Sequence, residues 1–561
     1  MTSTPQQAGL AHGAGDDRAD RARRKIMVVV AALLLLWWLL WLGAAPLFDV
    51  DEGAFAEASR EMLASNDWGH TTLNGADRFD KPILVYWLQA TSLAAFGSNE
   101  FAVRLPSALC AWGWCLAAWA FAARRWGARV GMAAGVVVAT SLGPLLIGRA
   151  ATADALLNVL LVLTMFDLWR FCESSAAHPE GPVPAHAQRV LRRGFAWAGL
   201  GLLAKGPVAV LVPIGAFVVW AAAGRNKNDW RTLGRMLSDR WAWALGTVIA
   251  VPWYAYAWWR HGPAFINGFF MRHNIDRFRG PLEGHGGSMA YYLVFLPLLM
   301  LPWTPLLAPL GAAAWRKWRS GALASETRFL LAWAAFVIVF FSLSGTKLPH
   351  YVLYGYTPFA LLAARKLVSG PVSGLCSKAV FLASAGLVAL GASSAALAAA
   401  AAARWGDAYW RLLLDPATLP AAPSLLFAAL ALLGIGAAAL LAQLRPERGV
   451  AALLGAAAVA GLWMSAQVVP WWAEALHGPV RVLAAEARER GWPLVQWRLH
   501  QPSAGFYRGQ AAPLRGPQPG EAAIVRVDRL GAPGSDRPPA LTLIRQERAM
   551  ALVIAGPSEN R

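Results

Sequence analysis

The acidic residues that follow the first long apolar segment are the clearest chemical signal in this sequence. Asp51 and Glu52 come directly after a hydrophobic run that ends near residue 47. An acidic pair at the mouth of a membrane helix is costly unless it faces water, a cation or a substrate. A carboxylate held in that position can orient or deprotonate an attacking group. The sequence therefore predicts catalytic roles for Asp51 and Glu52.

Further ionisable residues stand near the ends of other apolar segments. Such residues default to a functional hypothesis in a membrane protein. Together they combine acids, cations and imidazoles, a mixture that suits a phosphate-bearing substrate. We expect the following residues on the same side of the membrane as Asp51: Asp80, Lys81, Asp154, Lys205, His273, Arg277, His285, Lys347, His350 and Tyr351.

The acidic residues also have purely structural explanations. Asp51 and Glu52 could cap the helix that begins near Ala54, because acidic side chains favour helix starts. Asp80 and Asp154 each precede or begin an apolar helical pattern and could act as caps in the same way. Capping and function do not exclude each other, so both interpretations stay open.

The basic and imidazole side chains have structural alternatives as well. Lys205 and Lys347 could be interfacial cations whose aliphatic stems lie along apolar surface. His273 lies in no recognisable metal-ligand motif, and His285 stands in a glycine-rich loop. Acidic and histidine side chains from separate loops could nevertheless hold one divalent cation, which together with Lys and Arg would suit a phosphate.

The composition indicates a polytopic helical membrane protein. The chain has 561 residues, of which 57% are hydrophobic and 15% are charged. Its mean hydropathy is +0.41. A soluble domain would carry about a quarter charged residues. The apolar run at 26–47 exceeds the roughly 20 residues that a bilayer-spanning helix needs.

The formal net charge of +19 does not indicate nucleic-acid binding. The basic residues cluster in short loops between apolar segments, as expected for cytoplasmic loops of a membrane protein. A nucleic-acid-binding protein would instead gather them on one polar face. The four cysteines lie in or beside apolar segments without metal-ligand spacing, so packed thiols are expected.

Hydropathy and loop charge predict about 13 spans, with the N-terminus in the cytoplasm and the C-terminus outside. Residues 1–25 are expected to be a disordered cytoplasmic segment, and 26–470 the membrane domain. The spans are expected at about 26–46, 101–122, 130–147, from Asp154 to Arg170, two within 194–223, 241–259, and then ending near 314, 342 and 365, followed by 379–402, 423–443 and 450–470.

Two regions outside the spans are expected to fold on the external side. Within the loop 48–100, residues 54–64 and 83–96 predict amphipathic helices along the membrane surface. The tail 471–561 predicts a small α/β domain, with a helix at 479–490 and strand-like runs that begin at 493, 522 and 541.

Six short motifs occur in order along the chain: DEGAFAE at 51–57, FDKPILVYWL at 79–88, FAVRLP at 101–106, LAKGP at 203–207, NIDRF at 274–278 and KLPHY at 347–351. Together they resemble the bacterial branch of the protein O-mannosyltransferase superfamily, and in particular its ArnT-like lipid A aminoarabinose transferases. ArnT-like enzymes continue the first motif with Arg-Tyr where this sequence has Ala54 and Phe55. The resemblance extends over about residues 25–370 and implies an all-α GT-C fold in the inner membrane, with a periplasmic C-terminal α/β domain.

The resemblance also implies roles for individual residues. Asp51 resembles the family's catalytic carboxylate. Asp80 takes the place of a family glutamate at a metal site, with His273 as the histidine ligand of a zinc, magnesium or manganese ion. The full prediction is therefore Asp51, Glu52 and Asp154 as catalytic residues, Lys81, Arg277, Lys205, Lys347 and Tyr351 as donor-phosphate contacts, and Asp80 and His273 as metal ligands.

The function implied by the resemblance is inverting transfer of a sugar, such as aminoarabinose, from undecaprenyl phosphate or a similar lipid. The expected acceptor lies on the periplasmic side, with lipid A as the leading example and a protein as an alternative. The residues themselves leave two other classes open. A transporter of lipid-linked sugars would also carry intramembrane acids and broken helices. Glycan hydrolysis by paired carboxylates is a further possibility.

Overall fold

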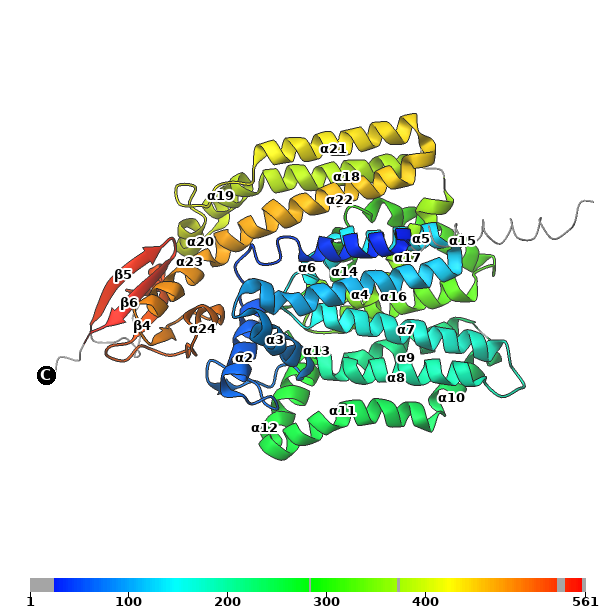
Figure 1. Ribbon diagram of the computed structural model, residues 1–561, viewed down its shortest axis with the longest axis horizontal. Coiled ribbons are helices and arrows are strands. Elements are labelled where there is room, and N and C mark those ends of the chain that lie inside the picture. Colours follow the sequence, from blue (N-terminus) through cyan, green and yellow to red (C-terminus); the bar gives the residue numbers. More distant parts are fainter. Residues whose placement is uncertain (1–24, 225, 282–283, 371–373, 532–539, 557–561) are drawn as a thin grey trace, which may run out of the picture.

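The computed structural model describes residues 25–224, 226–281, 284–370, 374–531 and 540–556. In these ranges the protein is mainly helical, and long helices lie side by side in one bundle (Figure 1). A small sheet lies at one end of the bundle beside α23 (Val469–Glu489) and α24 (Ser503–Arg508), and α2 (Asp51–Ser65) and α3 (Leu84–Phe96) lie beyond α24. The predicted disordered segment 1–25 lies outside the described residues except for its last residue.

Within these ranges, six helices are long and apolar enough to cross a bilayer. A further candidate is the pair of helices Tyr291–Leu299 and Thr304–Arg319, which is bent by 119°. Shorter apolar helices, among them Lys25–Leu39, complete the bundle. The six long helices are Glu100–Trp126, Asp154–Ala176, Ser325–Leu343, Leu375–Ala392, Leu425–Leu444 and the stretch Pro446–Glu489. The chain is therefore a multi-pass membrane protein.

Each of the about 13 spans predicted from hydropathy coincides with a helix or a broken helix. Besides the first helix, the corresponding elements are α4 (Glu100–Trp126), α5 (Ala128–Thr140) with α6 (Leu142–Ile147), α7 (Asp154–Ala176), α8 (Ala185–Lys205), α9 (Val208–Gly224), α11 (Arg240–His261), α14 (Tyr291–Leu299) with η2 (Thr304–Leu306) and α15 (Leu307–Arg319), α16 (Ser325–Leu343), α17 (Thr357–Ser369), α18 (Leu375–Ala392) with α19 (Ser394–Trp405), α21 (Leu425–Leu444) and α22 (Gly449–Trp463).

Several spans differ from the predicted ones in length or continuity. The span that α14 and α15 form together is bent in the segment that contains Pro302 and Pro305. Proline removes a helical hydrogen bond and clashes with the preceding turn. α8 begins at Ala185, so the short fifth span predicted to start near 194 is in fact 21 residues long. α22 does not stop near residue 470. It continues through η5 (Met464–Val468) into α23 (Val469–Glu489), which enters the C-terminal sheet region.

The loop 48–100 contains the two predicted helices and a hairpin between them. Strands β1 (Thr72–Leu73) and β2 (Ala76–Asp77) pair in antiparallel fashion around Asn74 and Gly75. Both turn residues have positive φ, 54° and 81°, the conformation that an Asn-Gly hairpin turn adopts. The sequence predicted that α2 lies along the membrane surface, but the structure places it inside the protein. Its residues from Glu52 to Met62 are buried, because α2 packs against both α3 and α24 (Ser503–Arg508).

The remaining elements connect the spans or lie beside the site. They are α10 (Lys227–Leu237), α12 (Pro263–Phe265), the π-helix η1 (Ile266–Asp276), α13 (Arg277–Arg279), the 3₁₀-helix η3 (Pro349–Gly355), α20 (Ala408–Leu413), η4 (Pro446–Arg448) and η6 (Val527–Arg529). The π-helix and the 3₁₀-helix carry parts of the NIDRF and KLPHY motifs, and such irregular helical turns frequently mark functional sites.

The C-terminal region has the predicted small α/β fold. Its sheet has the order β3-β4-β6-β5, in which β3 (Leu494–Gln496) runs parallel to β4 (Ala522–Arg526) and the other pairs are antiparallel. β5 (Leu541–Glu547) is the partly exposed edge strand. β6 (Met550–Ala555), an almost completely buried central strand, was not predicted from the sequence. A short apolar run of this kind has no alternation that would distinguish a strand from a helix.

The C-terminal region docks on the segment around residues 47–53 through polar contacts. Ser503 donates its backbone N–H to Asp49 Oδ1 at 3.0 Å, and its hydroxyl bonds Asp49 Oδ2. Leu47 N–H donates to the Tyr507 hydroxyl at 2.8 Å. A Cβ on Gly53 would lie 1.8 Å from Asp49 Oδ1 and 2.6 Å from the Ser503 nitrogen, so this close approach requires glycine in the DEG motif.

Asp49 is expected to make the stability of this docking depend on pH. Burial raises the pKa of Asp49 from 3.8 to about 7, against the hydrogen bonds from Ser503. Between these two values the folded protein holds a proton that the unfolded chain has released. The stabilisation is therefore fully present below the unfolded pKa and is lost as the pH rises through the folded pKa.

The measurement is the melting temperature of the wild type and of Asp49→Asn across the window from about pH 4 to pH 8. Asparagine carries no titrating proton, so the variant should lose less stability than the wild type as the pH rises. Parallel profiles for the two proteins would contradict the assignment of this pH dependence to Asp49.

Candidate active site

Asp51 begins α2 and points to a polar region between the bundle and the C-terminal sheet. The helix begins there because acidic side chains stabilise its first turn, in which Asp51 and Glu52 both stand. Asp51 is exposed, and no hydrogen bond joins its carboxylate to another of the described residues. It lines two neighbouring cavities. This carboxylate is therefore accessible to a ligand from two sides.

Glu52 points away from Asp51 and is held in a buried ion pair. Arg104 donates to its two oxygens at 2.8 and 2.7 Å, and the backbone N–H of Ala151 donates to Oε1 at 2.6 Å. Glu52 is 2% exposed and Arg104 3%. Although burial opposes it, the Arg104 charge holds the pKa of Glu52 below its usual value. The geometry therefore does not support the predicted catalytic role of Glu52, which instead fixes the start of α2 against α4.

Asp154, at the start of α7, is also held by several partners through its Oδ1. Its Oδ1 accepts a hydrogen bond from Lys205 Nζ at 2.5 Å and one from the Tyr354 hydroxyl at 2.6 Å. His350 Nε2 lies 3.5 Å from the same oxygen. Asp154 is 4% exposed. A carboxylate with these contacts positions Lys205 and the KLPHY segment, so a direct catalytic role for Asp154 is not favoured.

Asp80 lies on the opposite wall of the same region, between two cations. Arg78 Nη2 is 2.9 Å from Asp80 Oδ2, and Lys81 Nζ is 2.6 Å from Oδ1. His273 Nδ1 lies 3.1 Å from Oδ1. Although burial would raise it, the Lys81 charge together with His273 and Arg78 holds the pKa of Asp80 well below its usual range. Asp80 is therefore a carboxylate that organises cations around itself.

The metal site predicted for Asp80 and His273 does not fit this arrangement. Two cationic side chains already neutralise the Asp80 carboxylate. Among the residues that the structure describes, no group of three His, Cys, Asp or Glu side chains could hold a metal ion. A divalent cation prefers several oxygen or imidazole ligands without competing ammonium groups.

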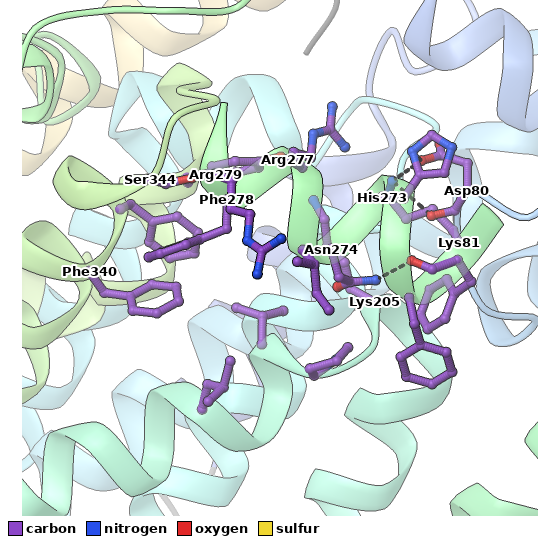
Figure 2. Close-up of a pocket in the computed structure, with 18 of the residues that line it drawn as sticks. Asp80, Lys81, Lys205, His273, Asn274, Arg277, Phe278, Arg279, Phe340 and Ser344 are labelled. Carbon is purple, nitrogen blue, oxygen red and sulfur yellow. Dashed lines mark hydrogen bonds and ion pairs between the residues drawn. The ribbon is translucent and has the colours of Figure 1, made fainter. Parts of the chain in front are cut away.

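Three cations converge beside Asp80, as Figure 2 shows. Lys81, Lys205 and Arg277 come from the loop 48–100, the end of α8 and α13, and all three line one cavity. Burial lowers the pKa of Lys81, and the charges of Lys205 and Arg277 lower it further against the pull of Asp80. Cations that repel one another in a buried cleft are stabilised by an anion. Lys and Arg together suit a phosphate group.

The cavity beside these cations, which we call the phenylalanine-lined cavity, has a volume of about 430 Å³. Its other walls are mainly apolar and come from α9, η1, α13 and α16, with Asn274, Arg279 and Ser344 as polar exceptions. Figure 2 shows Phe278 and Phe340 on the side of the cavity away from Asp80. The apolar lining is Pro207, Val208, Leu211, Phe269, Phe270, Ile275, Phe278, Phe340 and Phe341. A site with cations at one end and aromatic walls beyond them suits an amphipathic anion with a long apolar chain.

A second cavity of about 330 Å³, the polar cavity, adjoins the first. Asp51, Asp154 and His350 line it, together with cations of the phosphate region. Residues that the two cavities share are Asp80, Lys81, Lys205, His273, Arg277 and Tyr351. The cations thus stand at the junction of an apolar and a polar space, with Asp51 on the polar side.

The last two predicted phosphate contacts differ from each other. Tyr351 lines both cavities, and Lys205 Nζ lies 5.3 Å from the centre of its ring. Lys347 is buried, and its Nζ donates to the Ser344 carbonyl at 2.5 Å. It lines neither cavity. The structure therefore brings Tyr351 to the predicted phosphate region and leaves Lys347 as a residue that stabilises its own turn.

The sequence analysis did not single out four residues that shape this site. Arg78 and Arg104 hold the carboxylates of Asp80 and Glu52, and Tyr354 holds Asp154. Arg78 lies two residues before Asp80 in the sequence, so the ion pair between these two side chains could have been anticipated. His500 lines the polar cavity from the C-terminal region. No local motif marks it, because its proximity results from the docking of α24 on α2.

Comparisons with known proteins agree with the motifs. Residues 80–259 match the profile of the family described as dolichyl-phosphate-mannose-protein mannosyltransferase. The chain is 32% identical over 372 residues to an undecaprenyl phosphate-alpha-4-amino-4-deoxy-L-arabinose arabinosyl transferase of Erwinia tasmaniensis, which covers 66% of this chain and 64% of that one. The corresponding transferase of Aeromonas salmonicida is 31% identical over 331 residues, 59% of this chain and 58% of that one. The matched region thus spans less than two thirds of these relatives.

The fold is shared with solved transferase structures. The structure of ArnT from Cupriavidus metallidurans bound to undecaprenyl phosphate superposes with a TM-score of 0.76 at 22% identity, covering 95% of this chain and 99% of that one. The oligosaccharyltransferase of Archaeoglobus fulgidus superposes with a TM-score of 0.52 at 10% identity, covering 90% of this chain and 70% of that one. The predicted GT-C fold and the resemblance to the bacterial branch of the protein O-mannosyltransferase superfamily are thereby confirmed.

Proposed function

We propose that this chain, with its ArnT-like sequence and GT-C fold, is an inverting membrane glycosyltransferase. It moves a sugar, with aminoarabinose as the leading candidate, from a polyprenyl-phosphate donor such as undecaprenyl phosphate to a periplasmic-side acceptor such as lipid A. The observation that carries this proposal is the convergence of Lys81, Lys205 and Arg277 between an apolar cavity and Asp51. The match of residues 80–259 to a protein mannosyltransferase family keeps a protein acceptor as the second candidate.

The donor binds with its phosphate among the three cations and its first isoprene units in the phenylalanine-lined cavity. The remaining chain extends into the bilayer. Lys81 and Arg277 stabilise the negative charge that develops on the phosphate as it leaves, an electrostatic contribution that is commonly the largest in catalysis. Asp80 holds Lys81 at 2.6 Å, and Asp154 holds Lys205 at 2.5 Å, so both ammonium groups are in place before the donor arrives.

The transfer is a single displacement at the anomeric carbon. The acceptor oxygen forms a bond to this carbon from one face while the bond to the donor phosphate breaks on the other, with its electron pair going to the phosphate oxygen. Asp51 accepts the proton or the hydrogen bond of the acceptor's hydroxyl or acidic phosphate group. The products are polyprenyl phosphate and the glycosylated acceptor, and the configuration of the sugar inverts.

Purified protein and a labelled undecaprenyl-phosphate sugar test this function against transport. A transferase releases undecaprenyl phosphate and glycosylated acceptor in equal amounts in detergent, where no compartments exist. A transporter moves the intact lipid-linked sugar across a liposome membrane without cleaving it. Intact donor after incubation with both lipid A and protein acceptors would overturn the proposal.

We also propose an inner-membrane location with the site and the C-terminus in the periplasm. The proposal rests on the odd number of spans predicted from hydropathy and the basic loops on the other side. An alkaline phosphatase fused after Arg561 should be active, because that enzyme folds only outside the cytoplasm. An inactive fusion at this position, with an active cytoplasmic reporter there instead, would reverse the topology.

Replacing the cations is expected to impair use of the donor specifically. Lys81→Ala and Arg277→Ala each remove a charge-assisted phosphate contact worth roughly 1.5–3 kcal/mol. The kcat/KM for the donor should fall about tenfold or more, with a smaller change in the KM for the acceptor. Arg260→Ala is the matched control, since Arg260 pairs with Asp67 outside both cavities. Equal, small effects on both substrates would place the phosphate elsewhere.

A further inference from the structure

A separate cavity of about 340 Å³ lies between α4, α7 and α8, which run side by side through the bundle (Figure 1). We call it the Asp167 cavity. α7 begins at Asp154 in the candidate active site, and Asp167 lies about 20 Å further along this helix at 1.5 Å per residue. The Asp167 cavity shares no lining residue with the two cavities of the candidate active site. It therefore lies towards the opposite end of the bundle.

Asp167 is the buried carboxylate of this cavity, with a side chain that is 4% exposed. Arg193 donates to both of its oxygens, from Nε at 2.6 Å and from Nη2 at 2.8 Å. Trp197 Nε1 donates to Oδ2 at 3.2 Å. A bidentate arginine already neutralises a carboxylate and satisfies both of its oxygens. The link between α7 and α8 is therefore complete without a further cation.

Two more arginines nevertheless line the same cavity. Arg170 Nη1 adds a bond of 3.0 Å to Asp167 Oδ1. Arg124, in the last turn of α4, has no ion-pair partner in the described part of the chain, and its Nε donates to the Ala120 carbonyl at 3.0 Å. Three cations around one carboxylate repel one another unless another anion joins them. The cavity therefore carries an excess of positive charge.

The rest of the cavity is mainly apolar and belongs to helices that cross the membrane. α4 and α7 are both long and apolar enough to span a bilayer. The side chains of Arg170 and Arg193 are 28% and 50% exposed, so their guanidinium groups are accessible to a ligand. The apolar lining from α4 and α7 is Ala117, Ala120, Leu163 and Phe166. Arginines beside apolar surface in a membrane bundle suit an anionic head group that is attached to hydrocarbon chains.

We propose that the Asp167 cavity binds the phosphate of an anionic phospholipid of the surrounding bilayer, such as phosphatidylglycerol. The phosphate accepts hydrogen bonds from Arg124 and Arg170, and an acyl chain lies along the apolar wall. Basic pockets between membrane helices bind lipid head groups through this combination of charge and apolar contact. The lipid is neither the sugar donor nor the acceptor, so the inference goes beyond the proposed function and does not depend on it.

Native mass spectrometry of the full-length protein in detergent measures the affinity for the first bound lipid. Phosphatidylglycerol and the zwitterionic phosphatidylcholine are the probes. Arg170→Gln is expected to weaken binding of phosphatidylglycerol about tenfold, as loss of a charge-assisted contact does, and to change binding of phosphatidylcholine by no more than about twofold. The variant should fold, because Asp167 keeps both bonds to Arg193.

Two further variants separate the site from a general effect of charge. Ala120→Leu fills part of the cavity without changing any charge, so it should also weaken binding of phosphatidylglycerol. Arg129→Gln is the matched control, because Arg129 is an exposed arginine at the start of α5, just beyond the end of α4 and outside the cavity. It should change the affinity for neither lipid. The melting temperature of each variant shows whether it is folded.

Three results would contradict the inference. The first is unchanged affinity for phosphatidylglycerol in both Arg170→Gln and Ala120→Leu. The second is equal affinity of the wild type for the two lipids. The third is displacement of phosphatidylglycerol by glycerol phosphate at equal concentration, which would show a site for soluble anions. Because no sugar substrate is present, a protein that binds phosphatidylglycerol in this way but transfers no sugar would contradict only the proposed function.

Discussion

Asp51→Asn is expected to lower the rate of sugar transfer by roughly 10²- to 10⁴-fold, the usual contribution of a general base. The substitution keeps the size and reach of the side chain but removes its charge. Of the four acidic residues predicted for the site, Asp51 is the exposed one, whereas Glu52, Asp80 and Asp154 are each paired with a cation. Donor binding should persist, because the phosphate-binding cations come from other elements. Turnover, donor affinity and melting temperature, all measured in detergent, separate these effects.

The capping interpretation of Asp51 predicts the opposite result. Asparagine and aspartate are nearly equal helix caps, so an Asp51 that only stabilised the start of α2 would tolerate the change. Asp67→Asn is the matched control, since Asp67 also lies in the loop 48–100 and pairs with Arg260 outside the cavities. An Asp51→Asn protein with full turnover would remove this residue from the mechanism.

Glu52→Gln is expected to destabilise the protein strongly. The neutral side chain leaves the Arg104 charge buried without its counterion, and removing one partner of a buried pair costs about 3–5 kcal/mol. Arg104 would retain its bonds to the backbone carbonyls of Leu42, Ala45 and Pro46, which limits the loss but does not replace the charge. The melting temperature and the yield of folded protein measure this effect.

An exposed pair provides the comparison for Glu52. Glu180 and Arg231 lie 3.5 Å apart with side chains 91% and 56% exposed, so Glu180→Gln should leave the melting temperature unchanged. A Glu52→Gln protein as stable as the wild type, yet inactive, would contradict the structural assignment and return Glu52 to the catalytic residues.

The sequence predicted the bundle because hydropathy and loop charge are local signals. Three site residues could be placed near the ends of spans because each lies close to an apolar run in the sequence. They are Asp154, His273 and Tyr351. Asp51 was recognisable for the same reason, since an acid at the mouth of a span has few structural explanations. Hydropathy alone did not reveal the breaks between α5 and α6 and between α14 and α15, because the apolar character continues across them, although Pro302 is a local signal for the second break.

The pairing of side chains could not be predicted in the same way. Glu52 and Arg104 are 52 positions apart, and nothing local distinguishes Glu52 from its neighbour Asp51. The direction in which each points depends on the helical turn of α2 against α4. Likewise, the predicted membrane-surface position of α2 was wrong because α24, which is more than 400 residues away in the sequence, covers it. The hydrogen bond between Leu47 and Tyr507, which belongs to the same docking, spans 460 positions.

The anomeric configuration of the transferred sugar is the most direct test of single displacement at the donor phosphate. The measurement is the NMR coupling at the anomeric carbon of the product that purified protein forms from an undecaprenyl-phosphate sugar of defined configuration. We predict inversion, with one undecaprenyl phosphate released for each sugar transferred, because the cations and Asp51 act on opposite faces of the anomeric carbon. Retention of configuration would require a covalent intermediate on the protein and would contradict the account.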